Sequence, residues 1–106
     1  MKFEASGTVH KGDAWRCDPE EANGAVHIDN VDVVDEIWER KWQENVTAFI
    51  NGRLVGRGKL FTEYGGGFSE YTPIDEDRCA IGTTNLIESL LDYEGQQVTL
   101  LVTDEQ

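Results

Sequence analysis

Residues 46–61 read Val-Thr-Ala-Phe-Ile-Asn-Gly-Arg-Leu-Val-Gly-Arg-Gly-Lys-Leu-Phe, and they carry the clearest local structural signal in the chain. The dipeptide Asn51-Gly52 lies between two apolar runs. Asn-Gly in that position is typical of a type I′ turn, because both central residues need a positive φ. We therefore predict a β-hairpin of residues 46–50 and 54–61. Gly56 and Gly58 interrupt its second strand, which indicates a bulge or the close approach of another backbone segment.

Further strands are predicted near both ends of the chain. Residues 2–10 and residues 98–102 alternate apolar and polar side chains, the period of a half-buried strand. Residues 25–29 are a weaker strand candidate. Residues 11–24 have the composition of a long loop, with Trp15 packed on the core as a lid. Residues 64–73 have the composition of a mobile aromatic loop.

Two helices are predicted, each after a capping residue. Asp32 can cap a helix that runs to about Glu44. Its apolar stripe consists of Val34, Ile37, Trp38 and Trp42. Asn85 can cap a second helix that ends before Gly95, with Glu88 completing a variant of the capping box. The buried stripe of this second helix consists of Leu86, Ile87, Leu90 and Leu91.

The two tryptophans of the first helix have two interpretations. Aromatic residues at helical spacing usually belong to the core, which is the first interpretation of Trp38 and Trp42. Tryptophan is also enriched among the residues that dominate protein interfaces, so one of them could instead anchor a partner. The sequence does not decide between the two.

These elements predict one α+β domain spanning residues 1–106, with an antiparallel sheet and two helices. Without the weak strand at 25–29, the order is β-α-β-β-α-β, which is the ferredoxin-like arrangement of two split βαβ units. Segments 11–31 and 62–83 would then be insertions, longer than typical connections. The sequence shows no internal repeat and no linker between domains.

The charge of the chain limits what it can bind. Twenty-one Asp and Glu residues face nine Lys and Arg residues, which gives a formal charge of −12. Residues 45–62 hold Arg53, Arg57 and Lys59 and no acid, and acidic blocks flank this basic hairpin on both sides. A strongly negative surface repels nucleic acids and anionic membranes, and it attracts cations and basic proteins. We therefore expect neither direct nucleic-acid binding nor membrane binding.

The cellular setting follows from simpler features. The N-terminal sequence has no apolar region typical of a secretory signal, and no apolar stretch approaches the roughly 20 residues needed to span a bilayer. Two cysteines, Cys17 and Cys79, do not imply a disulfide framework. These features predict a soluble cytoplasmic protein with reduced thiols.

No motif for catalysis, cofactor binding or metal binding is complete. A calcium loop beginning at Asp75 would need Gly where Ala80 stands and a carboxylate where Leu86 stands. His10, His27, Cys17 and Cys79 lack the short spacings of zinc ligands. Residues 67–71 miss the second glycine of the nucleophile elbow, and residues 52–59 miss the phosphate-loop pattern. We therefore predict no cofactor, no metal and no catalytic residue, and we do not expect an enzyme.

The remaining function is protein binding. The sequence favours an acidic interaction module that docks on a basic protein. In its sharpest form the module is an inhibitor of the kind phages encode, which imitates nucleic acid. Duplex DNA carries one charge per roughly 1.7 Å of axis, and a carboxylate-rich face can approximate that density. This requires the acidic residues to share one face. The predicted partner-binding residues are Asp32, Asp35, Glu36, Glu39, Asp75, Glu76, Asp77, Glu88, Asp92 and Glu94.

Two alternatives to this function stay open. One is a structural or homo-oligomeric protein, such as a homodimer, in which the basic hairpin of one copy meets an acidic block of the next. The other is adaptation to a high-salt cytoplasm, in which case the charge says nothing about a partner.

Overall fold

The computed structural model describes residues 1–12, 25–42, 44–63, 67–69, 72–74 and 78–104. The strands are β1 (Lys2–Lys11), β2 (Val26–Ile28), β3 (Val31–Asp32), β4 (Val46–Ile50), β5 (Arg53–Gly58), β6 (Leu60–Glu63), β7 (Gly67–Ser69), β8 (Thr72–Ile74), β9 (Arg78–Ile81), β10 (Thr84–Asn85) and β11 (Gln97–Thr103). The helices are α1 (Val33–Glu39) and α2 (Leu86–Leu91). The prediction of an α+β fold with two helices is confirmed.

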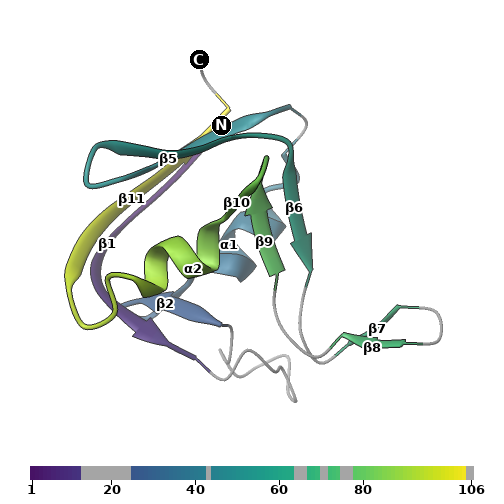
Figure 1. The fold of residues 1–106 in the computed structure, drawn as a ribbon, viewed down its shortest axis with the longest axis horizontal. Coiled ribbons are helices and arrows are strands. Elements are labelled where there is room, and N and C mark those ends of the chain that lie inside the picture. The colour runs from purple at the N-terminus through teal and green to yellow at the C-terminus, as the bar shows by residue number, and fades with distance from the viewer. Residues whose placement is uncertain (13–24, 43, 64–66, 70–71, 75–77, 105–106) are drawn as a thin grey trace.

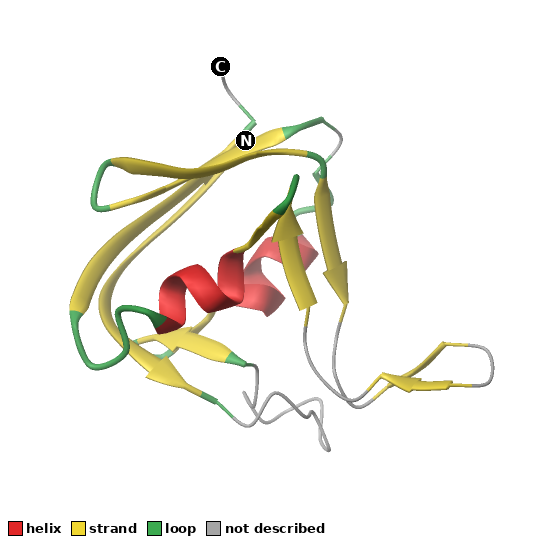
Figure 2. Cartoon of the chain, viewed as in Figure 1, coloured by secondary structure: helices red, strands yellow, loops and turns green. Residues whose placement is uncertain are grey.

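The strands form one large sheet and two small ones. The large sheet has six strands in the order β3-β2-β1-β11-β4-β5, a second sheet has the order β10-β9-β6, and β7 and β8 form a two-stranded ribbon. The large sheet curves around both helices, and β6 and β9 stand on the opposite side of them (Figure 1). Helices and strands therefore enclose one core (Figure 2).

Alternating side chains fill that core. Phe3, Ala5 and Val9 of β1 are buried, and Val98, Leu100 and Val102 of β11 are buried in the same alternation. This confirms the two terminal strands. The helices add Val33, Val34, Ile37, Leu86, Ile87 and Leu90. The core thus draws on both ends of the chain.

The predicted hairpin is confirmed in its turn and corrected in its second strand. Asn51 and Gly52 both have positive φ, 54° and 79°, as a type I′ turn requires. Ala48 lies opposite Gly56 and Phe49 opposite Leu54, so the strand bulges at Val55. The segment predicted as one strand over 54–61 divides after Gly58. Its first part is an edge of the large sheet, and its second part, β6, belongs to the three-stranded sheet.

Glycine is required at this division because two backbones nearly touch. Gly58 has a φ of 142°, and a Cβ built on it would lie 2.9 Å from the Cα of Gly82. A Cβ on Gly56 would lie 2.9 Å from the Cβ of Thr84, whose hydroxyl donates a hydrogen bond to the Val55 carbonyl at 3.0 Å. The expectation of a bulge and a close approach at these glycines is therefore confirmed.

Both helix caps are confirmed, but α1 is shorter than predicted. The Asp32 carboxylate accepts a hydrogen bond from the Asp35 N–H, and the Asn85 amide oxygen accepts one from the Glu88 N–H. The first helix ends at Glu39 rather than near Glu44, because Lys41 takes a φ of 52°, which a right-handed helix cannot contain. Trp42 consequently lies beyond the helix.

The ferredoxin-like strand order is not confirmed. The strands expected for that arrangement, β1, β4, β5 and β11, belong here to a six-stranded sheet that also holds β2 and β3, and β11 lies between β1 and β4. The prediction failed because segments 11–31 and 62–83 were treated as insertions. They contain β2, the first residue of β3, and β7 to β9, and β10 follows the second segment directly, so the omitted strand at 25–29 is real and each helix follows a short hairpin of its own. Part of the expected loop at 64–73 pairs as β7 and β8, while Trp15 lies outside the described residues.

The two halves of the chain repeat one motif, contrary to the expectation of no repeat. Each half consists of a long strand, a short hairpin, a capped helix and a final strand. The first half comprises β1, β2, β3, α1 and β4, and the second comprises β5 with β6, β9, β10, α2 and β11. Gly7 corresponds to Gly58, Asp32 to Asn85 and Val46 to Val98. Most other equivalent positions hold different residues, such as Val9 and Leu60 or Ile37 and Leu90, and the repeat is therefore not evident from the sequence.

The final strands of the two halves meet on a pseudo-twofold axis. Phe49 of β4 lies opposite Leu101 of β11, with the pair of Ala48 and Val102 on one side. The pair of Ile50 and Leu100 lies on the other side. The strand that opens each half pairs with the strand that closes the other half, since β1 pairs with β11 and β5 pairs with β4. Under this symmetry β1 pairs with β11 as β5 pairs with β4.

We predict that Gly58→Ala destabilises the protein by roughly 2–4 kcal/mol, because the added Cβ meets backbone and the φ is accessible only to glycine. Gly52→Ala is the matched control. It also has a positive φ, but no atom lies within 4 Å of the added Cβ, so its cost should be about 1–2 kcal/mol. Urea unfolding followed by circular dichroism measures both. Equal losses would show that the close contact with Gly82 contributes nothing.

Candidate functional site

The predicted acidic residues do not contribute equally to the surface. Asp32 is only 7% exposed. Its carboxylate is the cap of α1 and accepts the Asp35 N–H at 3.3 Å. Because its carboxylate is buried and caps α1, Asp32 does not contribute to a docking surface.

The α1 side chains are largely engaged within the protein. Glu36 forms an ion pair at 2.9 Å with Arg40, which lies four residues further along the chain. The Arg40 guanidinium also lies 4.8 Å from the centre of the Phe3 ring. Asp35 is half-buried, and Glu39 is exposed. Of the predicted residues on α1, Glu39 is the most available to a partner.

A second acidic group lies on and after α2. Glu88, Asp92 and Glu94 are all exposed, and we call these three residues the α2 acidic row. Glu88 and Asp92 are one helical turn apart, with the Asp92 N–H donating to the Glu88 carbonyl at 3.1 Å. Within the described part of the chain, no Lys or Arg forms an ion pair with this row. Asp75, Glu76 and Asp77 lie outside the described residues.

The two helices do not lie side by side in one layer. Each buries three apolar residues in the common core, and α2 lies nearer the viewer than α1 in Figure 1. The α2 acidic row holds three exposed carboxylates, whereas Glu39 is the only exposed one of the predicted acidic residues on α1. A docking surface is best assigned to the α2 acidic row alone.

The basic hairpin lies at an edge of the large sheet. Arg53 and Arg57 belong to β5, the last strand in the sheet order, and Lys59 follows it directly. All three are exposed, and the Arg57 guanidinium donates to the Thr47 hydroxyl at 3.3 Å. Bases and the α2 acidic row are thus separated along the chain and on different elements.

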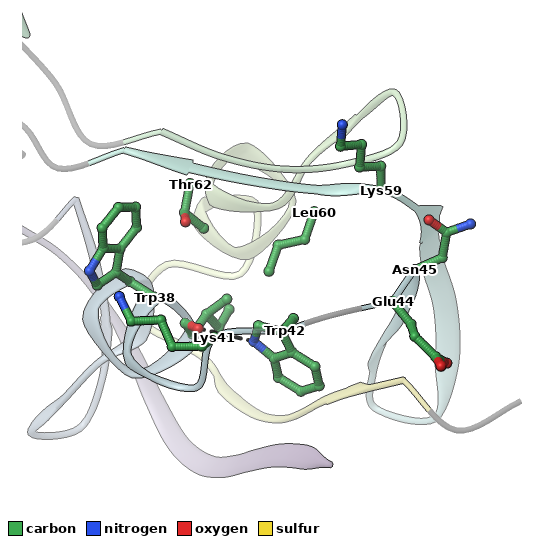
Figure 3. Close-up of a pocket in the computed structure, with 9 residues that line it drawn as sticks. Trp38, Lys41, Trp42, Glu44, Asn45, Lys59, Leu60 and Thr62 are labelled. Carbon is green, nitrogen blue, oxygen red and sulfur yellow. Dashed lines mark hydrogen bonds between the residues drawn. The ribbon is translucent and has the colours of Figure 1, made fainter. Parts of the chain in front are cut away.

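A cavity of about 360 Å³ opens between the end of α1 and β6. Leu60 and Thr62 project into it from β6, and Trp38, Lys41 and Trp42 line it from the α1 side (Figure 3). Lys59 also borders the cavity, but its side chain points the other way (Figure 3). The sequence did not predict this site, because nothing local indicates that β6 lies against α1.

The structure separates the two tryptophans. Trp42 packs against the core, and its indole Nε1 donates to the Ile37 carbonyl at 3.0 Å. Trp38 is 39% exposed, and the Lys41 Nζ lies 4.8 Å from its ring centre. Trp42 therefore packs on the core as the first interpretation predicts, and Trp38 presents an indole at the surface.

The histidines and cysteines do not assemble a metal site in the part of the chain that the structure describes. His10 and His27 are opposite each other on β1 and β2, while Cys79 is buried in the core. Cys17 lies outside the described residues. Within the described ranges, no three His, Cys, Asp or Glu side chains gather in a way that could hold a metal ion. Among these residues, too, no helix has the length and apolar character needed to cross a membrane.

Comparison with known proteins adds no further information: the chain matches no protein-family model, no curated protein and no solved structure.

We predict that Asp32→Ala lowers the free energy of unfolding by about 1–2 kcal/mol, because it removes the cap of α1. Asp32→Asn keeps an oxygen that can accept the Asp35 N–H and should cost only a few tenths of a kcal/mol. Thermal unfolding of the two variants measures the difference. An equal loss in both would mean that the charge of Asp32, and not its capping hydrogen bond, stabilises the fold.

Proposed function

We propose that this protein is a small acidic binding module that docks on a basic surface of another protein through the α2 acidic row. In its sharpest form, that basic surface is the nucleic-acid-binding surface of its target, which the module blocks by imitating nucleic acid. The observation that carries the proposal is the exposure of Glu88, Asp92 and Glu94 without an ion pair to any described base.

The spacing of the row supports this form of the proposal. Residues one turn apart on a helix are separated by about 6 Å along its axis, and each strand of duplex DNA presents one phosphate per roughly 3.4 Å of axis. A short helix with carboxylates on successive turns therefore offers a charge density within about a factor of two of one DNA strand. The formal charge of −12 adds a long-range field that draws a basic partner toward the module.

Structural features elsewhere favour binding over a purely solubilising role. Several acids outside the row already have partners within the chain: Glu36 pairs with Arg40, Glu63 with Arg78, and Asp104 with the N-terminal amine. An acidity that served only solubility would have no reason to leave the α2 acidic row as one local group.

The test compares two triple variants that lose the same charge. One is Glu88→Gln/Asp92→Asn/Glu94→Gln, and the control is Glu4→Gln/Glu39→Gln/Glu44→Gln, which removes three exposed carboxylates elsewhere. Each protein is immobilised, exposed to a cell extract, and washed at about 0.1 M and about 0.5 M NaCl, which shortens the screening length from about 10 Å to roughly half that. We expect the unmodified protein and the control to retain basic proteins that the added salt or duplex DNA releases. The α2 variant should retain at least about tenfold less.

Two results would contradict the proposal. Equal losses in both triple variants would assign binding to total charge, and retention that ignores added DNA would remove the nucleic-acid form of the proposal. Thermal unfolding between low and high salt examines the alternative of salt adaptation. A protein that unfolds in low salt and retains no basic partner would support that alternative instead.

A further inference from the structure

Comparison of the two halves shows that, among the described residues, one side of β6 lacks the backbone contact that the equivalent side of β1 has. Val9 of β1 corresponds to Leu60 of β6, and the turn after α2 covers the side of Val9 that faces away from β2. The Gly95 N–H donates to the Val9 carbonyl at 2.8 Å, and the Val9 N–H donates to the Gln96 carbonyl at 3.0 Å. A parallel bridge between Val9 and Glu94 completes this contact.

The described residues of the turn after α1 make no equivalent backbone contact with Leu60. The ladder between β11 and β1 extends to the pair of Gln97 and Thr8, but the ladder between β4 and β5 ends at Val46 and Gly58. Within the described residues, no backbone hydrogen bond joins Leu60 to the segment between α1 and β4. The cavity of about 360 Å³ lies at that place.

The backbone of β6 is oriented to accept a further segment. The Lys59 carbonyl accepts the Gly82 N–H at 2.9 Å, so the backbone groups of Lys59 face β9. In an antiparallel ladder, successive residues direct their N–H and C=O groups to opposite sides. The N–H and C=O of Leu60 therefore face away from β9, toward the outer edge.

We propose that this edge and its cavity bind a short extended segment of a partner protein, with a large apolar side chain in the cavity. Such a segment adds main-chain hydrogen bonds to a free strand edge while its side chains provide the specificity. We expect the ligand to be extended peptide backbone, because the chain's own extended backbone makes the equivalent contact with Val9 in the other half.

The side chains around the edge define the sequence of this segment. Trp38, Trp42 and Leu60 give the cavity an apolar lining. Its volume of about 360 Å³ is at the lower end of the range for ligand pockets and suits one large aliphatic or aromatic side chain. Neighbouring residues of an added strand point to opposite faces. The residue beside the apolar one would then meet Lys59, which is exposed and directed away from the cavity (Figure 3). An acidic residue at that position completes a cross-strand ion pair.

This site is independent of the α2 acidic row, and its test uses the intact protein. Random heptapeptides displayed on phage are selected on the immobilised protein, and the enriched sequences are synthesised. We expect a large apolar residue next to Asp or Glu, and binding that changes the tryptophan emission. The triple variant of the α2 acidic row should bind these peptides with unchanged affinity. Peptide binding at the β6 edge would therefore remain valid if docking through the α2 acidic row were disproved, and docking through that row would remain valid if no peptide bound.

Two matched comparisons identify the contacts. Trp38→Ala should weaken peptide binding at least about tenfold, whereas Phe61→Ala, which removes an exposed aromatic ring from β6 outside the cavity, should change it less than about twofold. Circular dichroism verifies that both variants are folded. Methylation of alternate peptide amides tests the edge without altering the protein, because only the amides that face β6 should be sensitive.

Three results would overturn the proposal. These are the absence of any enriched apolar-acidic sequence, equal affinity for Trp38→Ala and the unmodified protein, and equal tolerance of methylation at all peptide amides.

Discussion

The antiparallel pairing of β4 with β11 is the contact on which the rest of the structure depends. It joins the final strands of two equivalent halves, with Phe49 opposite Leu101 at the pseudo-twofold axis. Ile50 and Leu100 on these strands are fully buried, so the pairing also forms the centre of the core. Each half alone would leave its final strand with an unpaired edge and its helix with a half-covered apolar face. A strand with such an edge is prone to pair with other chains, and the fusion of two halves removes that hazard.

The repeat also explains how the chain can be both symmetric and functionally asymmetric. Equivalent glycines, Gly7 and Gly58, lie where each long strand passes close to the turn of the following hairpin, against Asp29 and Gly82 respectively. The frame is therefore conserved between the halves at its tightest points. The connections after the helices are where the halves differ. The connection after α2 forms backbone hydrogen bonds with Val9, whereas a cavity lined by Trp38 and Leu60 lies beside the connection after α1. Binding capacity thus lies at the place where the symmetry is broken.

The charge takes on a different meaning once the structure is known. The net charge of −12 by itself indicates only that the protein repels other copies and produces a long-range negative field. In the fold, Asp32 stabilises a helix terminus, Glu36 and Glu63 neutralise neighbouring arginines, and the α2 acidic row stays exposed. Ion pairs at a surface contribute little stability, typically below about 1 kcal/mol, so these pairings matter less for the fold than for which carboxylates a partner can reach. The two sites that we propose, the α2 acidic row and the edge of β6, lie on different elements.

The sequence by itself determined the elements whose causes are local. The turn at Asn51 and Gly52, the caps at Asp32 and Asn85, and the alternation of β1 and β11 follow from φ preferences, side-chain hydrogen bonds and period two, all of which act within a few residues. Only the tertiary structure decided the strand order, the division of the hairpin at Gly58, the early end of α1 and the position of the cavity. Each of these depends on which segments meet across long sequence separations. Hydrophobic patterning shows that a face is buried, but it does not say against which partner.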